Sequence, residues 1–425
     1  MRAAIIGAGY AGMAAAVTLA SERIPVTVFE SSRTLGGRAR RVDADGHRLD
    51  NGPHILVGAY TELLRLMRLV GADPERLLER RPLSLIFPGH MRLTAPRLPA
   101  PLHLAAALLT ARGLPLSARF SALRFMRAMQ RISFRLERDI SFTELMAQHR
   151  QHEDARRYLW QPLCVSALNT PPQNASAQIF LNVLRDTLAA KREASDLLLP
   201  RADFSALFPE PAEDFVRRHG GEVLRGTPIR AINWHSPGFT LEGDPAGRGY
   251  THVIAAVAPY HLPRLIEKLP RLQPVREAIA TLDHVPILTA YLGYSQPVRL
   301  PGAMIGIGET AHFLFQHTGN ILAAVISASS AHLSLSHAAL TERIHAEVRG
   351  IVPGAPAPAW SRVIIEKRAT FACRPGLRRP TCETPLDNFY LCGDYIASDY
   401  PATLEAAARS GVACGRRVRD QRRLD

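Results

Sequence analysis

The spacing of apolar residues predicts alternating strands and helices at the start of the chain. Residues 3–6 form a short apolar run, as in a buried strand, and residues 26–29 form a second one. Between them, the alanine-rich stretch 13–20 favours a helix. Strand, helix and strand in this order indicate an α/β fold.

Further strand-like runs follow in the second half of the chain. We expect strands over 223–232 and 251–257, each preceded by a glycine-containing turn. A later group of runs predicts a second sheet, at 287–294, 304–307, 312–316, 321–327 and 363–369. Residues 97–136 are instead rich in leucine, phenylalanine and methionine, and we expect them to form a helical cap over that sheet.

A glycine motif lies at the first strand–helix junction. Gly7, Gly9 and Gly12 follow the pattern G-x-G-x-x-G, which allows a tight turn, close approach to a pyrophosphate and close packing of the helix on the strand. The helix N-terminus supplies N–H groups for the phosphates. Glu30 ends the second strand, where its carboxylate can accept a hydrogen bond from a ribose hydroxyl. An acid here disfavours a 2′-phosphate, so the motif predicts FAD or NAD rather than NADP.

Other segments resemble motifs of the flavin amine oxidase and phytoene desaturase superfamily. The resembling positions are Gly37, Arg38, Gly393, Asp394, Thr403 and Leu404. The resemblance implies that FAD binds in an extended form between the N- and C-terminal parts of the chain. Arg38 can place its planar fork on the diphosphate, and Asp394 would lie near phosphate or ribityl hydroxyls. The helix that begins at Thr403 and Leu404 can direct N–H groups toward the flavin N1–C2=O side.

The same resemblance implies further cofactor-binding positions and a division into domains. The additional positions are Ser31, Gly52, Pro53, His54 and Ile229, the last at the adenine. We expect a discontinuous Rossmann-type FAD-binding domain and an α+β substrate domain with a mixed sheet and a basic amphipathic cap. The FAD-binding domain is expected at 1–85, 210–283 and 385–425, and the substrate-binding domain at 86–209 and 284–384.

A narrower resemblance lies in the middle of the chain. The run Q-P-L-C-V-S-A-L-N-T-P at 161–171 resembles a signature of the squalene-associated FAD-dependent desaturases, the hydroxysqualene dehydroxylases. Segments 51–60, 175–180 and 195–200 resemble the same family. This implies that reduced FAD delivers hydride to an allylic carbon of hydroxysqualene while the hydroxyl leaves as water, giving squalene for hopanoid lipids. A carotenoid-type desaturase and an amine oxidase remain alternatives, because they share the fold and the flavin.

Such a reaction needs an acid beside the flavin and a dry, apolar pocket. His54 is the first candidate acid, because an unperturbed imidazole pKa of about 6.5 suits proton donation. Asp399 and Tyr395 are weaker candidates, and a turn role is the alternative for Asp399. Cys164 is expected to be a buried apolar residue rather than a nucleophile. Residues 97–136 supply apolar side chains for the pocket, and no metal site is expected.

Charge is concentrated in one part of the chain. The 425 residues carry a net charge of +14, and 49 of the 52 basic residues are arginines. Residues 80–136 contain ten arginines and neither an acid nor a lysine, and 416–425 add five arginines and two aspartates. A polyanionic partner would suit this distribution. Nucleic-acid binding is not expected, because it would need aromatic residues interleaved with the basic ones, whereas leucine, alanine, phenylalanine and methionine lie opposite the arginines.

A basic amphipathic helix explains the arginine-rich window. Five arginines fall within about 80° of a helical wheel, at Arg124, Arg127, Arg131, Arg135 and Arg138. Apolar residues lie opposite them, at Phe125, Met126, Met129, Ile132 and Leu136. The helix could lie in a membrane interface and admit a long-chain isoprenoid, or it could pack on the core with its arginines in water.

The compartment follows from the cysteines and from the length of the apolar runs. Five cysteines without a C-x-x-C pair favour a reducing cytoplasm, and no apolar run reaches the ~18 residues that span a bilayer. We therefore expect a cytoplasmic protein, peripheral on the inner face of the cytoplasmic membrane. Enzymes that supply hydroxysqualene are expected partners, and the sequence does not identify the electron donor.

Overall fold

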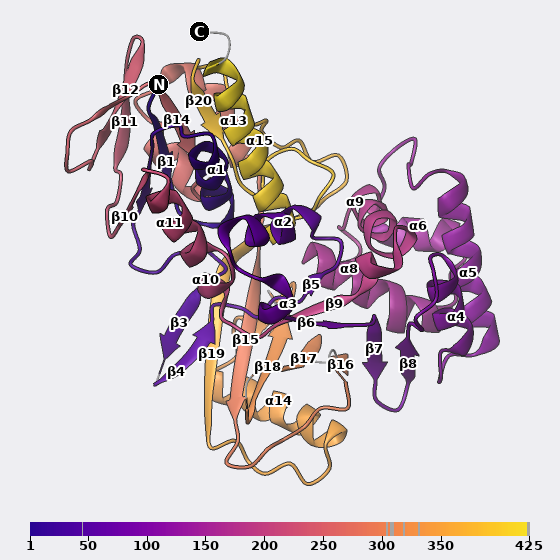
Figure 1. The fold of residues 1–425 in the computed structure, drawn as a ribbon. Helices are drawn as coiled ribbons and strands as arrows, with labels where there is room; N and C mark the ends of the chain where they lie inside the picture. The colour runs from indigo at the N-terminus through magenta and orange to yellow at the C-terminus, as the bar shows by residue number, and fades with distance from the viewer. Residues whose placement is uncertain (45, 303–304, 307–309, 318, 330–331, 423–425) are drawn as a thin grey trace.

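The computed structural model describes residues 1–422 except 45, 303–304, 307–309, 318 and 330–331. Its strands form two main sheets, and a group of helices lies to one side of them (Figure 1). The predicted fold class, a Rossmann-type α/β domain joined to an α+β part, is confirmed by this arrangement.

The first sheet has five parallel strands in the order β10-β2-β1-β14-β20. Their bounds are Ala3–Ile6 (β1), Val26–Glu30 (β2), Glu222–Arg225 (β10), His252–Ala255 (β14) and Phe389–Leu391 (β20). Both faces of β1 are buried: Ala4 and Ile6 pack into one apolar cluster, and Ala3 and Ile5 pack into another. A strand covered on both faces reads as a continuous apolar run, which is why the sequence pattern located it.

Helices cover one face of this sheet, and two of them pack unusually closely. They are α1 (Tyr10–Ser21), α2 (Thr61–Val70), α11 (Pro209–Arg218) and α15 (Leu404–Arg422). A Cβ on Gly411 of α15 would lie 2.1 Å from the carbonyl oxygen of Ala11 in α1, and one on Gly415 would lie 2.8 Å from Cβ of Thr18. Glycines on α15 therefore let the C-terminal helix rest directly on the first helix of the chain.

The prediction of one strand over 223–232 is wrong, because this run divides between two sheets. Gly226 has φ +67° and Pro228 follows it, so the chain turns after β10. The second half, β11 (Ala231–His235), joins β12 (Gly238–Glu242) and β13 (Gly249–Tyr250) in a small antiparallel sheet.

The second main sheet has seven strands in the order β19-β15-β18-β17-β16-β7-β8. Their bounds are Ser84–Phe87 (β7), Met91–Thr94 (β8), His284–Gly293 (β15), Ile305–Gly306 (β16), Phe313–Gln316 (β17), Ile321–Ile326 (β18) and Trp360–Phe371 (β19). Strands predicted at 287–294, 312–316, 321–327 and 363–369 are confirmed. Both ends of the run predicted at 304–307 lie outside the described residues. Helix α14 (His337–Ile351) packs on this sheet.

Short strand pairs connect the main parts. β3 (Arg41–Ala44) pairs with β4 (His47–Asp50), and β9 (Leu197–Pro200) lies between β5 (Leu56–Val57) and β6 (Leu78–Arg81). The expected domain boundary after residue 85 falls inside β7, which pairs with β8 and β16. We propose that the first segment of the substrate domain begins before β7.

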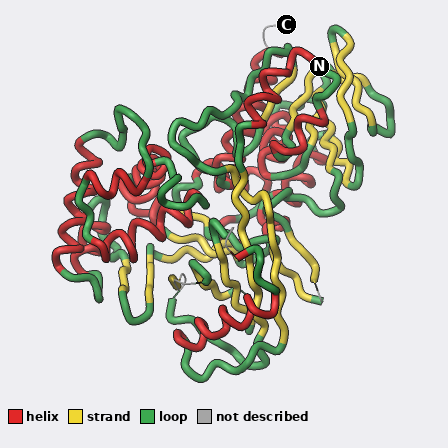
Figure 2. The backbone as a smooth tube through the Cα atoms, turned by 180° about the vertical axis from the view of Figure 1, so that it is seen from behind, coloured by secondary structure: helices red, strands yellow, loops and turns green. Residues whose placement is uncertain are grey.

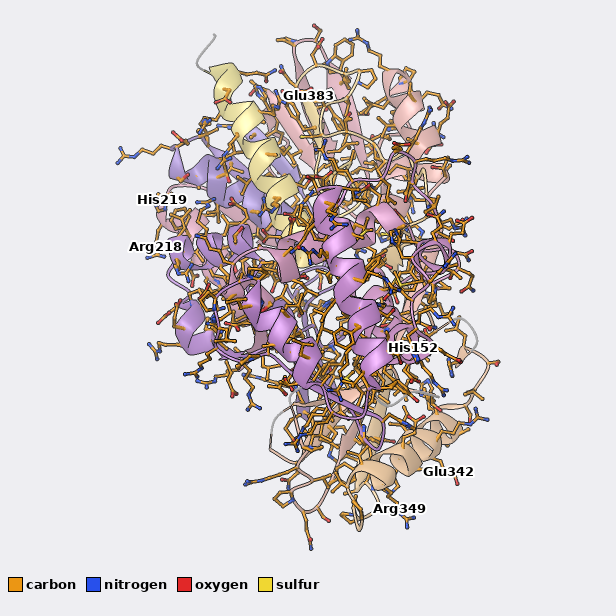
Figure 3. All side chains as sticks on the ribbon, turned by 90° about the vertical axis from the view of Figure 1, so that its right-hand side faces the viewer. His152, Arg218, His219, Glu342, Arg349 and Glu383 are labelled. Atoms are coloured by element: carbon orange, nitrogen blue, oxygen red, sulfur yellow. The ribbon has the colours of Figure 1, made fainter. Side chains whose placement is uncertain are left out.

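The helical lobe lies to one side of the two main sheets, next to β7 and β8, as Figure 2 shows. It contains α4 (Leu102–Thr110), α5 (Leu116–Arg131), α6 (Phe142–Gln148), α7 (Glu153–Ala155), α8 (Gln161–Leu168) and α9 (Ala177–Leu184). Figure 3 views the molecule with this lobe toward the reader. The helical cap expected from residues 97–136 thus corresponds to α4 and α5.

The predicted arginine helix is shorter than expected. α5 ends at Arg131, and the positive φ angles of Ser133 and Phe134 carry the chain away from its axis. Arg135 and Arg138 therefore do not lie on this helix, and neither do Ile132 and Leu136. The predicted apolar face is turned inward, with Phe125, Met126 and Met129 buried in the core.

Candidate cofactor and substrate site

Two glycine motifs from different parts of the N-terminal domain meet at the start of α1. The amide of Gly36 donates a hydrogen bond to Ala8 O at 3.0 Å, and a Cβ on Gly37 would lie 3.3 Å from Cα of Gly9. A Cβ on Gly12 would lie 1.9 Å from the carbonyl oxygen of Gly7. No side chain of the described structure caps α1, so its first N–H groups remain free for an anion. The backbone here forms a narrow cradle that suits a diphosphate.

Glu30 lies at one end of this cradle. Its carboxylate accepts hydrogen bonds from Ala8 N at 2.7 Å, from Ser32 N at 2.8 Å and from the hydroxyl of Ser31 at 3.2 Å. Each carboxylate oxygen has more than one lone pair, so Glu30 can also accept from a ribose. The amide of Thr227 donates to Glu30 O at 2.8 Å, which brings the half-buried Ile229 loop to the same end. The three positions expected at the adenosine end thus lie near one another.

Arg38 and Asp394 form an ion pair between the N- and C-terminal parts of the chain. Arg38 Nη2 lies 2.6 Å from Asp394 Oδ1, and Nη1 donates to Ala369 O at 2.5 Å. Burial lowers the pKa of Arg38, but Asp394 raises it further, so the guanidinium stays charged. The fork expected to hold the diphosphate is therefore already fixed by protein groups. Neighbouring Gly393 N donates to the Ser410 hydroxyl of α15 at 3.1 Å.

The C-terminal motif begins α15, and its acid holds a second helix. Thr403 caps α15 by accepting a hydrogen bond from Ala406 N at 3.1 Å. The adjacent Leu404 is the first residue of the helix. Glu405 is completely buried and accepts hydrogen bonds from Glu62 N and Leu63 N, both at 3.0 Å. The sequence analysis missed this role, because nothing local shows that α2 begins beside α15.

His54 lies at the open side of this region. Its ring packs edge-on against Phe204, with 5.2 Å between the ring centroids, and its side chain is exposed to solvent. Surrounding protein nevertheless desolvates the imidazole, and this effect together with the positive charge of Arg38 lowers the pKa of His54 to about 4. The assumption of an unperturbed pKa is therefore wrong. At neutral pH His54 is an uncharged imidazole that can donate or accept a hydrogen bond.

The other two candidate acids lie in different surroundings. Tyr395 is buried, its hydroxyl has no hydrogen-bond partner within the described residues, and burial raises its pKa well above the usual value. Asp399 has a side chain that is 69% exposed, 3.8 Å from Arg185 Nη2. Its backbone carbonyl accepts from Asn182 Nδ2 at 3.1 Å. Tyr395 remains a neutral hydrogen-bond donor, and Asp399 belongs to an exposed turn.

A further hydroxyl without a partner among the described residues, that of Thr289, faces the loop Gly52–Pro53–His54. Thr289, in the middle of β15, is 1% exposed, and its hydroxyl lacks a hydrogen-bond partner among the described residues. A Cβ on Gly52, the residue before Pro53, would lie 3.7 Å from that hydroxyl oxygen. Buried hydroxyls are usually hydrogen-bonded, so this one indicates that a polar group binds here. The cradle, the ribose acceptor and this hydroxyl together fit the phosphates, sugar and flavin of FAD.

The sequence analysis also missed a charged and aromatic cluster beside Arg38. The guanidinium of Arg368 lies 3.8 Å from the ring centroid of Tyr260, and the His284 ring lies 5.4 Å from the same ring. Nε2 of His284 is buried without a partner among the described residues. Asn51 Nδ2 donates to Arg38 O at 3.1 Å and to Glu366 at 3.2 Å. These residues come from four separate segments, so no sequence pattern groups them.

The signature segment 161–171 connects the helical lobe to the large sheet. It forms α8, and Asn169 ends that helix in the left-handed conformation, with φ 45°. Asn169 Nδ2 donates to Thr370 Oγ1 at 2.9 Å and to Val285 O at 3.3 Å, while Oδ1 accepts from Ala328 N at 2.6 Å. Within the same segment, Cys164 is fully buried and burial raises the pKa of its thiol, as expected of an apolar residue. The signature therefore includes a structural anchor.

A small cavity lies between the lobe and the large sheet. Eight leucines and Trp160 line it, and no polar atom faces it. Leu104 and Leu108 of α4 form part of the wall, whereas Leu98, Leu102, Leu109 and Phe120 from the predicted lining segment point into solvent. The cavity is dry and apolar, as the proposed chemistry requires, but it is too small for a thirty-carbon chain as it stands.

Comparison with known proteins identifies the family. The family model described as flavin containing amine oxidoreductase matches residues 10–419. A hydroxysqualene dehydroxylase of Rhodopseudomonas palustris is 30% identical, and the match covers 96% of both chains. A zeta-carotene desaturase of Synechocystis is 25% identical over 97% of this chain and 96% of its own. The structure of putrescine oxidase bound to putrescine is 17% identical, covers 99% of each chain and has a TM-score of 0.72.

The match to nearly the whole chain defines the class of protein. The chain belongs to the flavin containing amine oxidoreductase family. It is an FAD-dependent oxidoreductase. We propose that its glycine cradle, Glu30 and the Arg38–Asp394 pair hold the cofactor.

Proposed function

We propose that this oxidoreductase removes the hydroxyl of hydroxysqualene reductively, giving squalene for hopanoid and related isoprenoid lipids. The observation that carries the proposal is the similarity over 96% of both chains to a hydroxysqualene dehydroxylase. The 161–171 segment and the wholly apolar cavity support it. Reduced FAD, when bound, would supply the hydride for the allylic carbon and the proton with which the hydroxyl leaves as water.

The residues of this chain would exclude water and assist the leaving hydroxyl. An apolar surround such as the leucine-lined cavity would keep nucleophiles away from an electron-deficient allylic carbon. His54 is neutral above pH 4, so it would donate a hydrogen bond to the leaving hydroxyl rather than deliver a proton as imidazolium. Tyr395 is a second neutral donor in the same region.

Carotenoid desaturation is the second candidate, because a zeta-carotene desaturase matches over a similar length. Anaerobic single-turnover experiments separate the two functions. Photoreduced enzyme mixed with hydroxysqualene should regain the oxidised flavin spectrum and form squalene in equal amount. If hydroxysqualene leaves the reduced flavin unchanged while a carotene bleaches the oxidised flavin, the enzyme is a desaturase. An amine that bleaches it would instead identify an amine oxidase.

The lipid substrate bears on where the protein acts. None of the helices in the described part of the chain is both long and apolar enough to cross a membrane. We propose peripheral attachment to the inner face of the cytoplasmic membrane, because a triterpene reaches an enzyme from a bilayer more readily than from water and residues 80–136 carry ten positive charges without an acid.

A further inference from the structure

Exposed apolar side chains gather on one part of the helical lobe. Among the described residues, ten large hydrophobic side chains are exposed, and six of these lie between residues 98 and 132. They are Leu98, Leu102, Leu109, Leu116, Phe120 and Ile132. Scattered exposed leucines are ordinary, but a concentration within 35 residues of a 425-residue chain marks a binding surface.

The exposed residues of α5 form a single stripe. Leu116, Phe120, Arg124, Arg127 and Arg131 fall within about 80° of one another around the helix, and all five are exposed. The stripe is apolar in the first half of the helix and basic in the second half. The opposite face is buried, so the side chains available to a partner are those of the stripe.

Helix α4 extends this surface. Leu102 and Leu109 are seven residues apart, so they share one face of α4, and both are exposed. Arg119 of α5 donates to Leu109 O at 2.8 Å and to Leu114 O at 2.9 Å. These bonds hold the end of α4 against the start of α5, so the two helices present their exposed leucines together.

The inner side of α4 faces the apolar cavity. Leu104 and Leu108 line that cavity, while Leu102 and Leu109 on the same helix point outward. A single helix therefore separates the exposed leucines from the dry interior. This is the arrangement that a substrate passing from a lipid layer into the protein would require.

Exposed positive charges flank α4. Arg97 and Arg112 lie near the two ends of α4, and both are exposed. The nearest acidic helix, α7, contacts α5 through the half-buried bond from His152 N to Ser121 Oγ, on the buried side of α5. The acids of α7 are thus anchored behind the stripe. Apolar side chains next to clustered arginines match acyl chains next to anionic head groups.

We propose that α4 and α5 form the docking surface for an anionic lipid bilayer, with Leu102, Leu109, Leu116 and Phe120 entering the interface. Arg124, Arg127 and Arg131 then contact the phosphates of the head groups. The inference rests on the proposed function, because the cavity behind α4 would receive a substrate from the bilayer only if that substrate is a lipid. A second copy of this chain fits less well, because a two-fold contact through Leu116 and Phe120 would leave the arginines without an anionic partner.

Vesicle binding tests the surface separately from the chemistry. The full-length flavoprotein is sedimented with vesicles of phosphatidylcholine containing 30% phosphatidylglycerol, a composition of about one anionic lipid in three. Variants L109S/F120S and R124E/R127E should each bind the vesicles at least about tenfold more weakly than the parent protein. Added salt should weaken vesicle binding by the parent protein. Matched controls are L69S on α2 and R343E/R349E on α14, which change exposed residues elsewhere and should bind like the parent.

A second measurement distinguishes failure of the surface from failure of the proposed function. With hydroxysqualene in detergent micelles, all variants should retain the parent kcat/KM, because the changed residues are exposed and far from the flavin motifs in sequence. With hydroxysqualene in vesicles, the two docking variants should lose at least about tenfold in kcat/KM. An inactive parent in micelles would refute the proposed function and leave vesicle binding intact.

Three outcomes would overturn the docking surface. The parent does not bind the vesicles, or both docking variants bind as tightly as the controls, or the docking variants change only the oligomeric state. The last result would identify the surface as a contact between copies of the chain. Circular dichroism of each variant establishes that it is folded before binding is compared.

Discussion

Asp50 shows how one residue of a sequence motif acquires its properties from its surroundings. It ends β4, is 3% exposed and accepts a hydrogen bond from Phe204 N at 2.9 Å. Burial raises the pKa of Asp50 to about 7, the Phe204 bond lowers it, and the nearby Asp203 raises it. The same carboxyl in an unfolded chain would titrate near 3.9. Burial thus makes Asp50 a group that changes charge near neutrality.

This shift predicts a pH-dependent stability difference between the parent and D50N. Between pH 4 and pH 7 the folded state holds a proton on Asp50 that the unfolded chain has released, so the free energy of unfolding falls as pH rises. The side chain of D50N does not titrate. The free energy of unfolding of D50N should therefore rise by about 4 kcal/mol relative to that of the parent between pH 4 and pH 8. Urea unfolding at several pH values measures it. For the exposed control D387N, the difference in free energy of unfolding from the parent should not change with pH. If the difference for D50N also stays constant with pH, the assigned pKa is contradicted.

At the scale of elements, the flavin domain depends on close packing between the two ends of the chain. The glycines proposed to bind phosphate lie at the start of α1, and the C-terminal motif proposed to bind the flavin lies at the start of α15. Gly411 lies against Ala11, and Ser410 binds Gly393 N, so the contact also positions the loop that holds Asp394. The separation of these helices thus determines whether both motifs reach the same cofactor.

Replacing Gly411 tests this contact. Alanine favours a helix by about 1 kcal/mol over glycine, but its Cβ would lie 2.1 Å from Ala11 O, and a backbone atom cannot easily move away. G411A should therefore lower the free energy of unfolding by about 2 kcal/mol and reduce the FAD content of the purified protein. In the control G350A on α14, the new Cβ meets nothing within 4 Å. The free energy of unfolding of this variant should therefore equal or exceed that of the parent. Equal behaviour of both variants would exclude a close α1–α15 contact.

For the whole molecule, a few polar side chains join the parts into one structure. Asn169 connects the helical lobe to β15, β19 and the chain after β18. Glu405 joins α2 to α15, and Arg38 joins the glycine loops to Asp394. Each is at least partly buried and bonded to a segment distant in sequence. The lobe that carries the proposed membrane surface is therefore held to the seven-stranded sheet by specific hydrogen bonds.

Asn169 variants measure how strongly the lobe is attached. N169A should lower the free energy of unfolding by about 3 kcal/mol, because three hydrogen bonds are lost and alanine is strained at φ 45°. N169G loses the same bonds without the strain, so it should be more stable than N169A by about 1 kcal/mol. Chemical denaturation distinguishes them. A loss below about 0.5 kcal/mol in both variants would show that the lobe does not depend on this anchor.

How much was predictable depended on whether the information lay within one short segment. The strand and helix around the G-x-G-x-x-G motif, the strand ending at Glu30 and the helix beginning at Thr403 and Leu404 were predicted because each pattern is contiguous in sequence. The division of 223–232 was missed because Gly226 and Pro228 were included in one apolar run. The low pKa of His54 was missed because its cause, desolvation beside Arg38, arises only after folding.

The sequence by itself determined a dinucleotide cofactor and the α/β framework, because dinucleotide binding uses local backbone geometry that glycine spacing encodes. It also determined that residues 80–136 carry only positive charge. Only the tertiary structure decided which side of α5 meets solvent, because the core covers Phe125, Met126 and Met129 and leaves Leu116 and Phe120 exposed. Burial is a property of contacts between distant segments, so the surface proposed to meet the membrane could be located only in the folded molecule.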